Sequence, residues 1–369
     1  MKIVFTVDAL INAGTEKSIY ELCVVMKQNT EVELHVVYFF PFHGLKSAFE
    51  ELGVNLYFLN VNGKYNYIDG FFKLKKIIKK INPTVVVSSL YRANIISRLV
   101  CKSTNIPLVG TFVNNKYQKY LDTTKKKTLT ERAFFLLDKY TSGIPKMYIS
   151  NSDSIAVTNS KALAIPINKI QTVYRGRSAE HINKWLAPDN KNNFKFISVG
   201  RLLYEKGYSE LIEAFSKLKN DYPNIELTIY GEGNYRPQLT QLIADNNLKD
   251  AITLAGNVPF VYNRFSEANS FVFPSHNEGF SGALVEAMMS GIPSICSDIS
   301  MNLEAIQNDV TGKVFKVKDT ESLYLQMKWM LENYNSAIEL GNKAREDAYN
   351  RFEINAIAKQ YLQLLKDNQ

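Results

Sequence analysis

Cysteine and histidine are scarce in this sequence. Its 369 residues include three cysteines and four histidines, with no CxxC pair and no HxxxH spacing. A disulfide framework and a thiolate or histidine metal site are therefore not predicted, and no DxD-type carboxylate pair stands at a strand end. We expect a protein of a reducing cytoplasm that has no cofactor and no metal site.

Long apolar runs are also missing. No stretch reaches the roughly 18 apolar residues of a membrane-spanning helix. The first apolar run meets Asp8 too early for a signal peptide. Hydrophobic residues make up 46% and charged residues 22%, with 11 prolines and 18 glycines, which excludes collagen-like, coiled-coil and wholly disordered chains. We expect a folded protein whose membrane contact, if it has any, is peripheral.

Short β-branched runs alternate with helical patterns along most of the chain, which is typical of parallel α/β sheets. The polar stretch 174–195 interrupts this alternation and marks a domain boundary. We predict two doubly wound, Rossmann-like domains that face each other across a cleft, at 1–178 and 179–351, with a C-terminal helix at about 352–369 that packs back on the first. The clearest expected elements are strands at 3–7, 33–39, 85–88, 108–112, 194–199, 226–230 and 270–272, and helices at 19–26 and 71–81.

Charge is unevenly distributed between the two halves. Residues 1–185 carry 26 lysines and arginines against 13 acidic residues, whereas residues 186–369 carry 18 against 23. The basic half suggests an anionic partner, either a nucleic acid or a membrane surface. In the 71–81 helix the apolar residues share one face, which leaves Lys73, Lys76 and Lys80 outward, and Lys116, Lys119 and Lys125–Lys127 add to the same domain. A simply solvated helix face is the alternative.

Two stretches in the second half could bind a phosphorylated sugar. The 194–199 strand leads into Gly200, and the following loop places Arg201 and Lys206 five residues apart, a spacing that can bracket a diphosphate. Taken alone, these two residues are better explained as ordinary surface cations of a solvated loop.

The second stretch runs from Phe273 to Pro293. Ser281 can cap a helix that ends near Gly291, so the amides after Ser281 form an anion site at a helix N-terminus. Glu278 precedes this helix and Glu286 lies in its second turn. Two carboxylates beside a phosphate would repel it, so we expect them to accept hydrogen bonds from sugar hydroxyls instead. The alternative is a surface loop followed by the solvated face of a helix.

Together these stretches resemble the retaining nucleotide-sugar glycosyltransferases of family 4, which have the GT-B fold of two Rossmann-like domains. Their E-x7-E motif matches Glu278 and Glu286, and their Gly-Arg-Leu…Lys-Gly motif matches Gly200–Leu202 with Lys206 and Gly207. The resemblance implies that Arg201 and Lys206 hold the donor diphosphate, Glu286 the ribose hydroxyls and Glu278 the hydroxyls of the transferred sugar. It also implies that the sugar and the phosphate are contacted by the backbone amides of Gly279, Phe280, Ser281, Gly282, Ala283 and Leu284.

Other positions match less closely. Gly14 resembles the glycine-rich loop that approaches the phosphate or acceptor from the first domain, although Ala13 replaces one of the usual paired glycines. The family often has a histidine just after the strand that corresponds to 108–112, where this sequence offers Asn114. The usual turn before the second domain is altered at 174–178, which leaves Arg175 and Arg177 without an assigned role. His276 we interpret as a loop position without a chemical role, and His35, His43 and His181 as structural.

The sequence therefore predicts a glycosyltransferase that moves a hexose from a nucleoside-diphosphate sugar, with uridine as the expected base, to a hydroxyl of a glycan or lipid-linked glycan in cell-surface polysaccharide synthesis. We expect retention at the anomeric carbon and a cytoplasmic location that includes the inner face of the membrane. A nucleotide-sugar epimerase or hydrolase of the same fold is the first alternative. A basic nucleic-acid-binding protein is the second, although no recognition motif for nucleic acid occurs.

Overall fold

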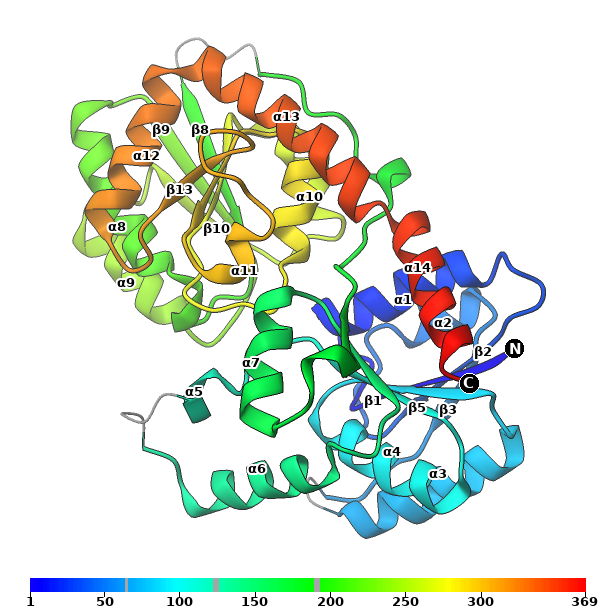
Figure 1. Cartoon of the computed structure of the whole chain (residues 1–369). Coiled ribbons are helices and arrows are strands. Elements are labelled where there is room, and N and C mark those ends of the chain that lie inside the picture. Colours follow the sequence, from blue (N-terminus) through cyan, green and yellow to red (C-terminus); the bar gives the residue numbers. More distant parts are fainter. Residues whose placement is uncertain (64–65, 122–125, 189–192) are drawn as a thin grey trace. The chain divides into compact units, whose positions relative to one another are not determined.

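The computed structural model describes residues 1–63, 66–121, 126–188 and 193–369. The chain divides into two compact units (Figure 1): one contains residues 1–176 and 354–369, the other residues 177–353. The expected boundaries, at 178 and 351, lie close to these divisions.

The N-terminal unit is built on a seven-stranded parallel sheet with the order β3-β2-β1-β4-β5-β6-β7. The order reverses between β1 and β4, where Phe5 pairs with Val36 on one side and with Val87 on the other. This reversal is the mark of a doubly wound sheet. The strands are β1 (Lys2–Val7), β2 (Glu33–Tyr38), β3 (Asn55–Phe58), β4 (Val85–Ser88), β5 (Leu108–Phe112), β6 (Met147–Ser150) and β7 (Ile170–Thr172).

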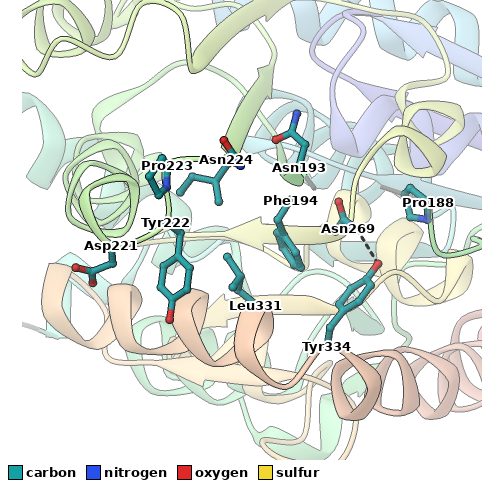
Figure 2. Close-up of a pocket in the computed structure, with 11 residues that line it drawn as sticks. Pro188, Asn193, Phe194, Asp221, Tyr222, Pro223, Asn224, Asn269, Leu331 and Tyr334 are labelled. Carbon is teal, nitrogen blue, oxygen red and sulfur yellow. Dashed lines mark hydrogen bonds between the residues drawn. The ribbon is translucent and has the colours of Figure 1, made fainter. Parts of the chain in front are cut away.

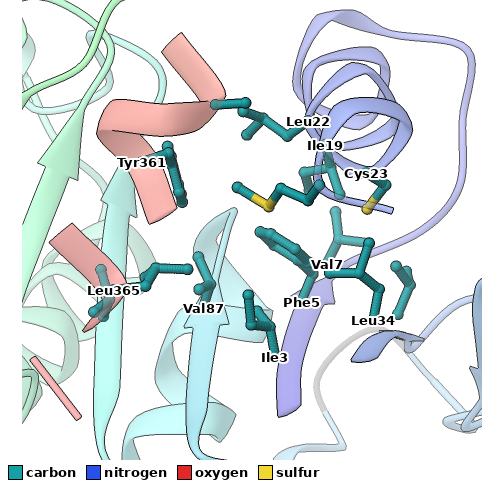
Figure 3. Packing of buried hydrophobic residues seen from close by; sticks show 14 of the residues in the cluster. Ile3, Phe5, Val7, Ile19, Leu22, Cys23, Leu34, Val87, Tyr361 and Leu365 are labelled. Atoms are coloured by element: carbon teal, nitrogen blue, oxygen red, sulfur yellow. The ribbon is translucent and has the colours of Figure 1, made fainter. Parts of the chain in front are cut away.

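Helices cover the sheet of this unit because each presents an apolar stripe to it. One core lies under α1 and α14, where Ile19 and Cys23 of α1 meet Phe5 of the sheet and Tyr361 and Leu365 of α14 (Figure 3). The C-terminal helix thus shares the core of the N-terminal unit. The helices are α1 (Gly14–Met26), α2 (Lys46–Glu51), α3 (Tyr67–Ile81), α4 (Tyr91–Thr104), α5 (Gln118–Leu121), α6 (Leu129–Thr141), α7 (Asp153–Leu163) and α14 (Ile354–Asp367).

The second unit has a six-stranded parallel sheet with the order β10-β9-β8-β11-β12-β13, which reverses between β8 and β11. In doubly wound sheets, ligands bind at the carboxyl ends of the strands beside such a reversal. The strands are β8 (Phe194–Val199), β9 (Ile225–Tyr230), β10 (Ile252–Gly256), β11 (Ser270–Phe273), β12 (Ser294–Ser297) and β13 (Lys313–Phe315). The helices are α8 (Tyr208–Asp221), α9 (Arg236–Asp245), α10 (Gly282–Ser290), α11 (Ser300–Leu303), α12 (Thr320–Glu332) and α13 (Tyr334–Phe352).

The prediction of two Rossmann-like domains is confirmed by these two sheets. Across the described ranges, no helix combines the length and the apolar character that crossing a membrane would require.

Candidate functional site

The two stretches singled out in the sequence lie side by side in the second unit. Strands β8 and β11 are hydrogen-bonded neighbours, and the two loops leave their carboxyl ends. The amide of His276 donates to the carbonyl of Glu205 at 2.8 Å, and the Ser275 hydroxyl donates to the same carbonyl at 3.3 Å. The loop after β8 is therefore fastened to the loop after β11.

Lys206 and Glu278 form an ion pair in which the lysine Nζ donates to Glu278 Oε1. Both side chains are 13% exposed, so solvent screens this pair less than it would a surface pair. The Ser275 hydroxyl donates to the same Oε1 at 2.9 Å. The structure thus brings together a residue expected at the diphosphate and one expected at the transferred sugar.

Gly207 fixes the distance between these loops. Its φ of +70° lies in the left-handed region, and a Cβ atom there would stand 2.0 Å from the carbonyl oxygen of Pro274. No side chain fits such a contact. Gly207 is also the N-cap of α8 and directly follows the 3-10 turn that carries Lys206. A larger residue at 207 would therefore push Lys206 away from Glu278.

Arg201 differs from Lys206 in its surroundings. Its side chain is exposed and makes no ion pair or side-chain hydrogen bond with any residue that the structure describes. The backbone beside it is held firmly, because the amide of the buried Leu202 donates to the carbonyl of Glu232 at 2.9 Å. Arg201 is thus a solvated cation on a fixed backbone.

Helix α10 begins as the sequence predicts. The Ser281 hydroxyl accepts the amide of Leu284 at 3.4 Å, and Gly291, with a φ of +88°, ends the helix. Phe280 is buried against Phe352, with ring centroids 5.3 Å apart. Only the backbone of Phe280 is therefore placed to contact a ligand, as the resemblance implies for this segment.

Glu286 has a partner that sequence reasoning missed. The Arg177 Nε donates to Glu286 Oε1 at 2.6 Å, and the two side chains are 7% and 14% exposed. The guanidinium also lies over Gly282, where a Cβ atom would stand 1.8 Å from Nη2. No local pattern predicts this contact, because Arg177 and Glu286 are 109 positions apart.

His276 joins its loop to helix α8. Its buried ring places Nε2 3.0 Å from Glu210 Oε1 and packs edge-on against Tyr204. Burial raises the pKa of Glu210, but the hydrogen bond and charge of His276, a backbone hydrogen bond and the charge of Lys318 together outweigh it, so that the pKa is lowered from 4.5. His276 therefore packs and fastens the loop that carries Glu278.

In the N-terminal unit, Gly14 begins α1 and lies against Arg175, since a Cβ atom at Gly14 would stand 2.9 Å from the arginine Nη1. Asn114 accepts the amide of Lys116 at 3.3 Å through Oδ1, as a turn residue does. Lys116 places its Nζ 3.3 Å from the centroid of the Tyr91 ring, and burial lowers its pKa to about 8. The role expected for Gly14 stays a prediction.

Among the described residues, no three histidine, cysteine or acidic side chains cluster in a way that could hold a metal ion. The three cysteines are buried and unpaired, and burial raises the pKa of the Cys101 thiol to about 12. Such thiols are poor nucleophiles.

A separate pocket of about 400 Å³ lies at the opposite end of the second sheet (Figure 2). Phe194, which begins β8, lines it together with Tyr222, Leu331 and Tyr334, and the Asn269 amide donates to the Tyr334 hydroxyl at 2.9 Å. None of the residues expected to bind the donor lines this pocket.

Known proteins similar to this chain are glycosyltransferases, as the geometry of the second unit suggests. Residues 179–347 match the family model of glycosyl transferases group 1. A Campylobacter jejuni N-acetylgalactosamine-N,N'-diacetylbacillosaminyl-diphospho-undecaprenol 4-alpha-N-acetylgalactosaminyltransferase is 29% identical over 250 residues, which cover 63% of this chain and 67% of the relative. The capsular polysaccharide biosynthesis glycosyltransferase CapH of Staphylococcus aureus is 29% identical over 286 residues, covering 76% and 77%.

Solved structures support the same fold over the whole chain. Anabaena HepE, in a crystal structure with UDP-glucose, superposes with a TM-score of 0.86 at 17% identity and covers 100% of both chains. The assignment to family 4 stays a prediction, since the matching model is described only as glycosyl transferases group 1. From its two sheets, its paired loops and these relatives, the chain is a glycosyltransferase with the GT-B fold, and its residues 179–347 match the model of glycosyl transferases group 1.

Proposed function

We propose that this protein is a retaining glycosyltransferase that transfers a hexose from a UDP-sugar to a hydroxyl of a lipid-linked glycan in cell-surface polysaccharide synthesis. The observation that carries the proposal is the meeting of Lys206, Glu278 and the N-terminus of α10 at the carboxyl ends of β8 and β11. This arrangement offers cations and amides to a diphosphate, and a carboxylate to sugar hydroxyls.

The relatives support the substrate classes in this proposal. HepE was crystallised with UDP-glucose, CapH is named for capsular polysaccharide biosynthesis, and the Campylobacter enzyme is named for a diphospho-undecaprenol acceptor. Retention rests on the resemblance of the Glu278–Glu286 motif to family 4.

Donor binding would place the diphosphate at the first amides of α10, with Arg201 and Lys206 as its cations. Negative charge grows on the leaving diphosphate as the glycosidic bond breaks, and groups already aimed at that charge stabilise the transition state most. Lys206 also keeps Glu278 in place as an acceptor for sugar hydroxyls. Glu286 would accept hydrogen bonds from the ribose.

The test is nucleotide release from a panel of nucleoside-diphosphate hexoses, measured with and without a synthetic lipid-diphosphate-linked glycan. We expect UDP release that depends on the acceptor, and a product whose anomeric configuration, read by NMR, equals that of the donor. Release without acceptor would instead indicate a hydrolase. Conversion of the donor into its epimer would indicate an epimerase, and either result would overturn the proposal.

We further propose that the N-terminal unit docks on anionic membranes, although its surface differs from the one expected. Lys73 does not point freely outward, since its Nζ donates to Asp69 at 2.8 Å and to the Asn60 carbonyl at 2.7 Å. Lys76 and Lys80 are exposed. Lys126 and Lys127 lie within the described residues, whereas Lys125 lies outside them.

Helix α6 adds apolar side chains to this surface. Leu129 is 83% exposed, Leu136 50% and Tyr140 86%. Phe134 of the same helix lies 6.4 Å from Tyr67 at the start of α3, between ring centroids, so the two helices are neighbours. Exposed leucines and tyrosines beside lysines are typical of surfaces that sit at a bilayer interface.

A further inference from the structure

Arg177 has no role in the donor contacts described so far, yet its position is closely fixed. It is the first residue of the second unit. Its amide donates to the carbonyl of Phe352 at 2.9 Å, and its backbone forms a parallel bridge with Glu353, the last residue of that unit. The backbone of Arg177 is therefore held against the segment through which the chain leaves the unit.

The side chain of Arg177 reaches from there to helix α10. Its guanidinium covers Gly282, the first residue of the helix, and its Nε–H is bonded to Glu286, one turn further along. Gly282 and Glu286 share one face because four residues make about one turn. A Cβ atom at 282 would occupy the space of the guanidinium, so Arg177 keeps this position only beside a glycine.

The electrostatics of this position are unusual. A cation at a helix N-terminus faces the positive end of the helix dipole, which disfavours it. The buried, charge-assisted hydrogen bond to Glu286 offsets this repulsion and fixes one carboxylate oxygen in a single orientation. An isolated surface arginine would have no reason to lie there.

We propose that Arg177 is a positioning residue for the donor nucleotide, which orients Glu286 so that this carboxylate accepts the ribose hydroxyls. The inference rests on the proposed function, since it needs a nucleotide at this site. Arg177 acts through Glu286 and is not itself a catalytic residue.

The experiment is calorimetry of the full chain with two probes, UDP and 2′,3′-dideoxy-UDP, which lacks both ribose hydroxyls. We expect Arg177→Gln to weaken UDP binding about tenfold or more, because it leaves Glu286 without its charged donor. Binding of the dideoxy nucleotide should be unchanged from the unmodified protein. Arg177→Lys should restore part of the preference for UDP over the dideoxy probe.

Arg345→Gln is the matched control. Arg345 contacts the other end of α10, where its Nη1 donates to the carbonyl of Met289. Its loss should shift thermal stability without changing the preference for UDP. A merely structural role for Arg177 would give the same pattern as this control.

Gly282→Ala provides a second route if Arg177→Gln folds poorly. It should displace Arg177 and reduce UDP binding in the unmodified background, but add little to Arg177→Ala, where no guanidinium stands in the way. Equal losses for UDP and the dideoxy probe, or no loss for either, would overturn the inference. Failure of the unmodified protein to bind UDP would instead overturn the proposed function.

Discussion

At the scale of single residues, the donor site depends on cations with different surroundings. Lys206 is partly buried and paired with Glu278, whereas Arg201 is exposed. Sequence spacing predicts both as diphosphate ligands but cannot distinguish them, because the difference arises from β11 and its loop. The same holds for Arg177, whose partner comes from a distant helix.

We predict that Arg201→Ala and Lys206→Ala each lower turnover by about 10²-fold, because each removes a donor aimed at the developing negative charge. Lys206→Ala should also destabilise the fold by about 1–3 kcal/mol, since Glu278 loses its charged partner, whereas Arg201→Ala should not. Turnover assays check the first effect and thermal unfolding checks the second, in each of the two variants. Lys217→Ala, which breaks an exposed pair with Glu321, is the control. Near-normal turnover in both folded variants would contradict the assignment.

Glu286→Gln and Glu278→Gln should separate ribose binding from sugar binding. We predict that Glu286→Gln weakens binding of the free nucleotide diphosphate by about 1–3 kcal/mol, because a charged acceptor becomes neutral. Glu278→Gln should reduce turnover more than nucleotide binding. Calorimetry with UDP alone measures this, and an equally severe loss for Glu278→Gln would show that the two roles are wrongly divided.

Lys116 should make stability depend on pH. Its pKa is lowered by burial from 10.5 to about 8. Between these values the unfolded chain keeps a proton that the folded chain has lost, so stability should rise with pH across this window. Lys116→Met removes the titrating group. The free energy of unfolding, measured with urea at pH 8 and pH 10, should therefore rise less for the variant than for the unmodified protein. An equal rise in both proteins would refute this.

At the scale of elements, local signals account for what the sequence could predict. The ends of α10 follow from Ser281 and Gly291, which act on their immediate neighbours. Helix α3 begins at Tyr67, earlier than its apolar pattern suggests, because the Asn66 side chain caps it by accepting the amide of Asp69. Strands β7 and β13 have three residues each, too few for a periodic pattern.

Docking of α3 and α6 on lipid is tested by liposome sedimentation. We predict binding that needs anionic lipid and weakens with salt, since each lysine contributes about 1 kcal/mol near a charged surface. Replacing the lysines at 125–127, or Lys76 and Lys80, by glutamine should reduce binding to anionic vesicles. Leu136→Ser together with Tyr140→Ser should reduce this binding further. The control is Leu186→Ser, at an exposed leucine of the other unit. Equal binding to neutral and anionic vesicles, or none to either, would contradict the proposal.

At the scale of the whole molecule, both sheets are parallel and doubly wound. The alternation of strands and helices in the sequence is enough to predict this architecture. The division of the chain was less visible, because the polar stretch spans many residues whereas the structure divides at single positions. The charge difference between the halves predicts an anionic partner for the first but cannot say which of its lysines are free.

We predict that transfer continues in the presence of EDTA. Arg201, Lys206 and the N-terminus of α10 are positioned to neutralise the leaving diphosphate, so charge stabilisation does not require an added ion. Turnover in chelated buffer, compared with the same buffer plus Mg²⁺ or Mn²⁺, checks this. An absolute requirement for either metal would contradict it.

The most direct test of the central claim is the transfer of labelled sugar from a UDP-hexose into an organic-extractable, lipid-linked glycan. The account predicts label in the organic phase with the unmodified protein, and a loss of about 10²-fold with Lys206→Ala. If label stays in the aqueous phase for every UDP-hexose, or if Lys206→Ala transfers it equally well, the protein does not use this site to transfer sugar as proposed.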